Sequence, residues 1–157
     1  MSEQQTSQSS FGIYSLYALG AIACFVFFQF FYPYHLFYQE QNQLFLSSWD
    51  YLTTYLDKPG WLACLAGDFL TQFYYFRYAG PIILTLCILI TGHNVKCAVR
   101  DADIQGKKAA DIVAFIMMIL LVCFSFHYDY RLCSILAIAG GASVFRVSTK
   151  LLTSTRM

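Results

Sequence analysis

Residues 78–95 read YAGPIILTLCILITGHNV, a run of 18 positions without Asp, Glu, Lys or Arg. At about 1.5 Å per residue, a helix of this length crosses most of a hydrocarbon core about 30 Å thick. The Gly80-Pro81 pair near its start is compatible with the first turn of a helix. The stretch therefore predicts a membrane-spanning helix.

Three further stretches have the same apolar character. They are residues 11–33 (FGIYSLYALGAIACFVFFQFFYP), 109–127 (AADIVAFIMMILLVCFSFH) and 132–149 (LCSILAIAGGASVFRVST). Pro33 marks the end of the first, and Arg146 in the last turn of the fourth is expected to snorkel to the interface. The predicted fold class is an all-α membrane protein with about four transmembrane helices.

Composition agrees with a membrane protein. Of the 157 residues, 58% are hydrophobic and 12% are charged, whereas soluble domains have roughly 45–50% and about 25%. The net charge is +1 and the bases do not interleave with aromatic residues, which argues against nucleic-acid binding. The 6 cysteines are scattered without a CxxC pair, which argues against a zinc site or a disulfide framework.

The segment 34–77 is predicted to be a structured loop with two amphipathic helices lying along the membrane surface. One apolar stripe comprises Phe45, Trp49, Leu52 and Leu56, and a second comprises Leu62, Leu65, Phe69, Phe73 and Phe76. The recurrence at three and four positions is typical of an amphipathic helix. Lys58-Pro59-Gly60 separates the two stripes, as expected of a turn.

The distribution of basic residues predicts the orientation. Seven Lys and Arg residues fall on the side of loop 96–108 and the C-terminal end, against three on the other side. Because positive charge stays on the cytoplasmic side, both termini are expected in the cytoplasm of a cell whose inner membrane holds the chain. The predicted organisation is a polar tail at 1–10, which lacks the features of a cleavable signal peptide, one transmembrane module at 11–149 and a cytoplasmic tail at 150–157.

Titratable side chains gather in the outward loop, where His35, Glu40 and Asp50 lie beside amphipathic surface. A carboxylate at the edge of a low-dielectric wall can act as a general base, or can bind a divalent metal ion held by a diphosphate. The alternative is that these are ordinary solvated acids. No cofactor motif is evident, and loop 96–108 lacks the signature of a phosphate-binding loop.

The stretch from His35 to Ile83 resembles the N-terminal part of an uncharacterised family of bacterial multi-pass membrane proteins. The matching elements are His35, the run Glu40 to Phe45, the pair Asp50-Tyr51, the turn Pro59-Gly60 and the run Phe69 to Tyr74. The match covers residues 11–95, and the remainder matches only as a pattern of hydrophobic spans.

That family looks like the integral-membrane glycosyltransferases that use polyprenyl-phosphate sugars, known as GT-C-like enzymes. Those enzymes carry an acidic residue early in a large outward loop, followed by two surface helices before the second span. The resemblance implies Glu40 or Asp50 as the catalytic acid, with His35, Gln41, Gln43 and Gln72 as substrate-binding side chains. It also implies a polyprenyl-phosphate lipid as a partner, besides ordinary membrane lipids.

Two departures limit this prediction. Trp61 stands where the family is expected to have a second Gly, and the enzymes have many more spans than four. One hypothesis is therefore an incomplete or split module of such a glycosyltransferase, acting at the outer face of the inner membrane. The alternative is a non-enzymatic accessory or scaffold subunit, in which small residues such as Gly140 and Gly141 allow a partner helix or a second copy to approach closely.

Overall fold

The structure, a computed structural model, describes residues 15, 17–42, 45–46, 48–102, 107–127 and 129–154. Within these ranges every regular element is a helix. The predicted all-α fold class is confirmed.

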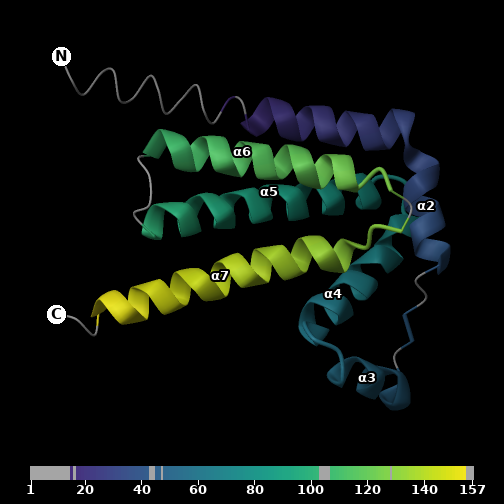
Figure 1. Cartoon of the computed structure of the whole chain (residues 1–157). Coiled ribbons are helices and arrows are strands. Elements are labelled where there is room, and N and C mark those ends of the chain that lie inside the picture. Colours follow the sequence, from purple (N-terminus) through teal and green to yellow (C-terminus); the bar gives the residue numbers. More distant parts are fainter. Residues whose placement is uncertain are drawn as a thin grey trace.

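Four helices form a bundle in the described part of the chain (Figure 1). They are the first helix Tyr17–Phe31, α5 Ala79–Asp101, α6 Lys107–Phe124 and α7 Leu132–Ser154. The α5 helix is central, because it packs against both α6 and α7. Successive helices run in opposite directions, so the start of the first helix and the end of α7 lie at the same end of the bundle.

The first helix ends in a π-helical turn at Phe27–Phe31 and is followed by a sharp bend of 76°. The next helix, α2 (Pro33–Asn42), then runs across the end of the bundle (Figure 1). Pro33 does end the first helix, as predicted. Pro33 is also the first residue of α2, a helix where the sequence predicts a loop. Proline suits the first helical position because it lacks an N–H and has a fixed φ.

Two short helices follow, as the apolar stripes predict. The α3 helix is Trp49–Leu56, capped by Ser48, whose hydroxyl accepts a hydrogen bond from the Tyr51 N–H. The α4 helix is Trp61–Thr71 and continues into the 3₁₀ turn η2, Gln72–Tyr75. Gly60 joins α3 to α4 with φ 73°, a conformation that glycine adopts without steric cost. The two predicted helices are present, but α4 does not lie only along a surface, because it packs against α7.

The α5 and α7 helices are longer than the apolar stretches that predict them. The α5 helix continues past residue 95 to Asp101, with Arg100 in its last turn, and α7 continues to Ser154. Residues 150–154 are therefore helical and not a separate tail. The two helix ends are joined by an ion pair, in which Arg146 donates to Asp101 at 3.1 Å.

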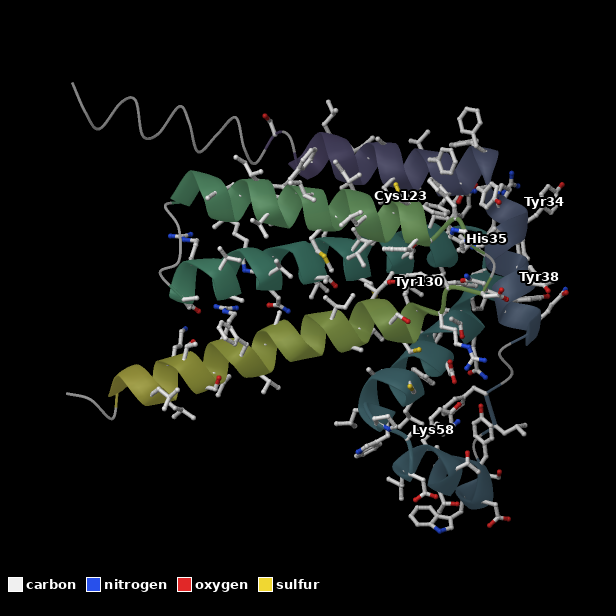
Figure 2. All side chains as sticks on the ribbon, viewed as in Figure 1. Tyr34, His35, Tyr38, Lys58, Cys123 and Tyr130 are labelled. Atoms are coloured by element: carbon white, nitrogen blue, oxygen red, sulfur yellow. The ribbon has the colours of Figure 1, made fainter. Side chains whose placement is uncertain are left out.

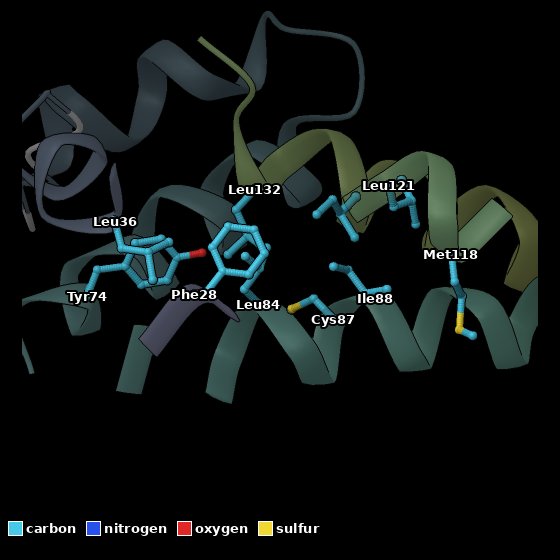
Figure 3. Close-up of a cluster of buried hydrophobic side chains, with 10 residues drawn as sticks. Phe28, Leu36, Tyr74, Leu84, Cys87, Ile88, Met118, Leu121 and Leu132 are labelled. Atoms are coloured by element: carbon cyan, nitrogen blue, oxygen red, sulfur yellow. The ribbon is translucent and has the colours of Figure 1, made fainter. Parts of the chain in front are cut away.

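Side chains from all four bundle helices and from η2 meet in one core (Figure 3). Its fully or nearly fully buried members include Phe28, Tyr74, Leu84, Ile88, Leu121 and Ile135. A close backbone approach fixes α4 against α7, because a Cβ on Gly67 would lie 2.7 Å from the backbone nitrogen of Cys133. Glycine is thus required at this crossing.

By length and hydropathy, two helices in the described ranges can cross a membrane, Ala79–Asp101 and Leu132–Leu152. The bent pair Tyr17–Phe31 and Pro33–Gln41 makes a third if it counts as one span, whereas the apolar helix Ala109–Phe124 is shorter. The structure therefore supports apolar helices compatible with a membrane, and two to three spans where the sequence predicted four.

Candidate functional site

Polar side chains are buried where α2 crosses the end of the bundle, near the turn between α6 and α7. His35 and Gln39 on α2 are 2% and 6% exposed, and they line one small cavity together with Tyr130 and Ser125. Figure 2 labels His35 and Tyr130 at this end of the bundle. We call these four residues the cap site. Polar groups at such low exposure are retained only where hydrogen bonds compensate for the loss of water.

Hydrogen bonds define the protonation state of the cap site. Gln39 Nε2 lies 3.2 Å from His35 Nε2 and donates to the Tyr130 carbonyl at 3.0 Å. Because an amide nitrogen only donates, His35 Nε2 accepts and a neutral ring carries its proton on Nδ1. Burial lowers the pKa of His35, and a hydrogen bond with the Ser125 backbone opposes part of that effect. His35 is thus held as a neutral imidazole.

A small cavity of about 10 Å³ adjoins the cap site. The Tyr74 side chain, 2% exposed, also lines it, and burial raises the pKa of the Tyr74 hydroxyl. That hydroxyl has no hydrogen-bond partner among the described residues. A cavity of this size accommodates about one water molecule, not a substrate. The cap site therefore has no room for a substrate.

A second polar chain joins α3 to α4. The Tyr55 hydroxyl donates to Asp68 Oδ2 at 2.6 Å, and the Tyr51 hydroxyl lies 2.6 Å from that of Tyr55. Since Tyr55 has one proton and donates it to the carboxylate, Tyr51 must donate to Tyr55. Burial, followed by the hydrogen bond with Asp68, raises the pKa of Tyr55. We call these three residues the tyrosine–aspartate chain.

Asp68 itself is 9% exposed, and its second oxygen, Oδ1, is buried without a hydrogen-bond partner among the described residues. A buried carboxylate with an unsatisfied oxygen costs stability and is commonly kept for a functional reason. Lys58 lies 4.7 Å above the Tyr55 ring, which brings a positive charge to the outer side of the same chain.

The two acids predicted as catalytic lie in different settings. Glu40 is partly buried on α2, next in sequence to Gln39 of the cap site. Asp50 is exposed in the first turn of α3, where a negative charge is stabilised by the helix dipole. Each role stays a prediction, but Asp50 has a sufficient structural explanation and Glu40 does not.

The predicted substrate-binding residues are dispersed. His35 belongs to the cap site, whereas Gln41 is exposed and Gln43 lies outside the described residues. Gln72 donates to the Phe45 carbonyl at 2.9 Å and thereby holds the segment before α3 against η2. His35 is therefore the one of these four whose side chain is shown in a buried polar site.

Asp68, Tyr55 and Gln39 are not among the site residues that the sequence predicts. The sequence does contain an indication of this site, because Asp68 stands within the apolar run Leu65 to Leu70, where a charged side chain needs a partner. That partner, Tyr55, lies on a separate helix beyond the Gly60 turn, so periodicity along one helix could not reveal it.

An apolar cleft of about 350 Å³ opens between the first helix, α5 and α6. Small and apolar side chains line it, among them Gly20, Ala23, Ile88, Phe115 and Val122. Such a surface matches an acyl or isoprenoid chain and offers almost nothing to a polar ligand.

Within the described ranges, no three His, Cys, Asp or Glu side chains converge to hold a metal ion. The divalent cation considered from the sequence therefore has no ready-made protein site in that part of the chain. Binding would require oxygens from a ligand such as a diphosphate.

The fold and the buried polar sites define a helical protein with apolar helices compatible with a membrane. The chain belongs to DUF6057, a family of unknown function, which it matches over residues 8–156. No curated protein and no solved structure matches it. Family membership is thereby shown, whereas the likeness to polyprenyl-phosphate-sugar glycosyltransferases stays a prediction.

Proposed function

We propose that the chain is a multi-pass membrane module with four spanning helices and both termini in the cytoplasm. Large apolar side chains on the outer faces of the helices support this proposal. Exposed examples are Ile82, Leu86 and Ile90 on α5, Ile112, Ile116 and Ile119 on α6, and Val144, Val147 and Leu151 on α7. Contiguous apolar surface of this kind is unstable in water and suits lipid.

The alternating directions of the four bundle helices also support an even number of crossings (Figure 1). The α6 helix has a short apolar stretch, but its N-terminal Asp111 pairs with Lys96 of α5, so charge is neutralised at that end. A local pair of this kind lets a short helix cross with little penalty at the interface. The basic ends of α5 and α7 then face the cytoplasm.

Within that topology we propose that the chain is an incomplete module of a lipid-linked sugar transferase, acting at the outer face of a bacterial inner membrane. The observation that carries this proposal is the layering at the outer end. The buried cap site lies at the end of the apolar bundle, and an apolar cleft of about 350 Å³ opens between the first helix, α5 and α6, with Phe27 and Cys123 lining it. An amphiphile with a long chain and a charged head requires such a layering.

Glu40 is the proposed acid in this function. It is partly buried on α2, next to the cap site that fixes the orientation of that helix. Exposed bases on the same side, Arg77 and Arg131, provide positive charge for a phosphate head. The remaining parts of a transferase site would come from another chain.

Native mass spectrometry of the protein extracted from its host in mild detergent tests this function. We expect a bound polyprenyl-phosphate lipid together with a helical partner chain. In the complex, Glu40→Gln should abolish sugar transfer while Asp57→Asn, an exposed acid after α3, leaves it unchanged. A chain that carries only ordinary phospholipids, or a Glu40→Gln complex with normal turnover, would contradict the proposal.

A second candidate, a non-enzymatic accessory subunit, has its own support on α7. Only 17% of the apolar window of α7 is buried by the rest of the chain, against 39% for α5. Gly140 and Gly141 have nothing near their Cβ positions, so the backbone there is open to another helix. The face fits a partner helix or a second copy of the chain.

Leucine substitution at Gly140 and Gly141 tests this candidate by native mass spectrometry of the extracted complex. We expect the larger assembly to dissociate, because leucine side chains prevent close approach of helix backbones. Ala18→Leu, at an exposed small residue on the first helix, is the control and should leave the assembly intact. Unchanged assembly in the glycine variants would exclude this face as the contact.

A further inference from the structure

Two cysteines from distant parts of the sequence meet at the crossing of α4 and α7. Cys64 lies in the first turn of α4, and Cys133 is the second residue of α7. Their side chains lie within interaction range of each other. Both are partly exposed, so a reagent of small size can reach them.

The glycine at this crossing fixes the geometry. Gly67 is three residues after Cys64 and therefore lies on the same face of α4. A Cβ on Gly67 would lie 2.9 Å from Cys133 Cβ, so the backbones of the two helices nearly touch there. A disulfide requires Cβ atoms about 3.5–4.5 Å apart, and the close approach of the two backbones at Gly67 brings Cys133 toward the face of α4 that carries Cys64.

The setting makes the pair chemically relevant. With the proposed topology, on which this part of the inference rests, both thiols lie at the outer end of the bundle. Compartments outside the inner membrane are oxidising and favour disulfides. The other four cysteines are spread over the first helix, α5 and α6.

We propose that Cys64 and Cys133 form a reversible disulfide that locks α4 onto the outer end of α7. The oxidant is a disulfide, either of a small molecule or of a thiol oxidoreductase. The Cys64 thiolate attacks that disulfide, forms a mixed disulfide and releases one thiol. The Cys133 thiolate then attacks the sulfur of Cys64 and releases the second thiol, so that two protons and two electrons leave with the reduced oxidant.

The lock would act on the tyrosine–aspartate chain. Asp68 follows Gly67 directly on α4, and its charge acts on Cys133. Fixing α4 against α7 therefore fixes the carboxylate to which Tyr55 donates. Because α4 already packs against α7 with both thiols free, the disulfide would limit separation of the two helices and would not create their contact.

The test uses the purified, fully reduced chain in detergent, exposed to mixtures of oxidised and reduced glutathione and then trapped by alkylation. We expect two of the 6 thiols to become resistant to alkylation together, and peptide mass spectrometry to identify a Cys64–Cys133 bridge. Cys64→Ser should instead leave a glutathione adduct on Cys133. Cys24→Ser is the matched control and should still form the bridge.

Alkylation of intact cells before lysis separates this inference from the proposed topology. A bridge in the purified chain and in cells supports both. A bridge in the purified chain with both thiols reduced in cells supports the pair and overturns its outward placement. If both thiols stay reactive at every glutathione ratio, or other cysteines become bridged, the proposed pair is wrong.

Discussion

Tyr55 donates a hydrogen bond of 2.6 Å to Asp68, and this bond joins the last turn of α3 to the middle of α4. Both side chains are buried, at 3% and 9% exposure. A hydrogen bond to a charged acceptor in such a place contributes about 1.5–3 kcal/mol. It therefore fixes α3 against α4 in the segment between the first helix and α5.

Tyr55→Phe should lower the free energy of unfolding by about 1.5–3 kcal/mol, because it leaves the Asp68 carboxylate without its donor. Unfolding in detergent, followed by circular dichroism against denaturant, measures the change. Tyr51→Phe is the matched control and should cost less than about 1.5 kcal/mol, because Tyr51 donates only to a neutral hydroxyl. Equal effects of the two variants would contradict the proton direction assigned above.

The pH dependence of stability should report the cap site. Burial lowers the pKa of folded His35 below its ordinary value of about 6.5, so the unfolded chain takes up the proton more readily. Stability from this residue is therefore complete above pH about 6.5 and is lost as pH falls below that value. Thermal unfolding between pH about 8 and about 5 measures this loss.

His35→Gln should flatten that pH profile, whatever its effect on stability at neutral pH. His127→Gln, at an exposed histidine of the α6–α7 turn, is the control and should keep the slope of the parent chain. If the stability of His35→Gln still falls with pH as steeply as that of the parent chain, another titratable group is responsible.

Gly67→Ala should weaken the contact between α4 and α7. The new Cβ would lie 2.7 Å from the Cys133 backbone nitrogen, so the helices must separate or shift. Such overpacking typically costs about 1–3 kcal/mol of unfolding free energy. Gly141→Ala, which meets nothing within 4 Å, is the control and should be neutral or slightly stabilising, because alanine has the higher helix propensity. A neutral Gly67→Ala would mean that α4 does not pack on α7 so closely.

Labelling with a membrane-impermeant thiol reagent should reveal the topology. We expect Cys64, after mild reduction, to react from the outer side of intact cells, and Cys97 to react only after the membrane is opened. Cys97 is partly exposed at the basic end of α5, where its sulfur lies 3.6 Å from His93. Reaction of both cysteines from the same side would contradict an odd number of crossings between them.

Apolar runs predicted the bundle because hydropathy over a long window is a local property of the sequence. Residues 78–95 and 132–149 cover α5 and α7 from their N-terminal ends, and both helices continue beyond them only at the C-terminal end. The ends of these helices were predicted too short because contacts between helices fix them. Arg146 with Asp101, for example, joins residues 45 positions apart.

The α2 helix shows why the site was harder to predict than the fold. Its sequence, PYHLFYQEQN, has no clear apolar stripe, and three-dimensional contacts alone bury His35 and Gln39. The resemblance drew attention to His35 and Glu40 by their position after the first helix. It gave no indication that Gln39 connects α2 to the turn between α6 and α7.

That connection has a consequence for how the chain is made. Gln39 donates to the carbonyl of Tyr130, 91 residues later in the chain, and no earlier segment supplies that acceptor. While the ribosome is still adding α6 and α7, Gln39 has its contact with His35 in α2 but lacks the Tyr130 carbonyl. A chain interrupted after α5 would therefore leave the position of α2 across the end of the bundle unfixed, and would expose that helix to proteases.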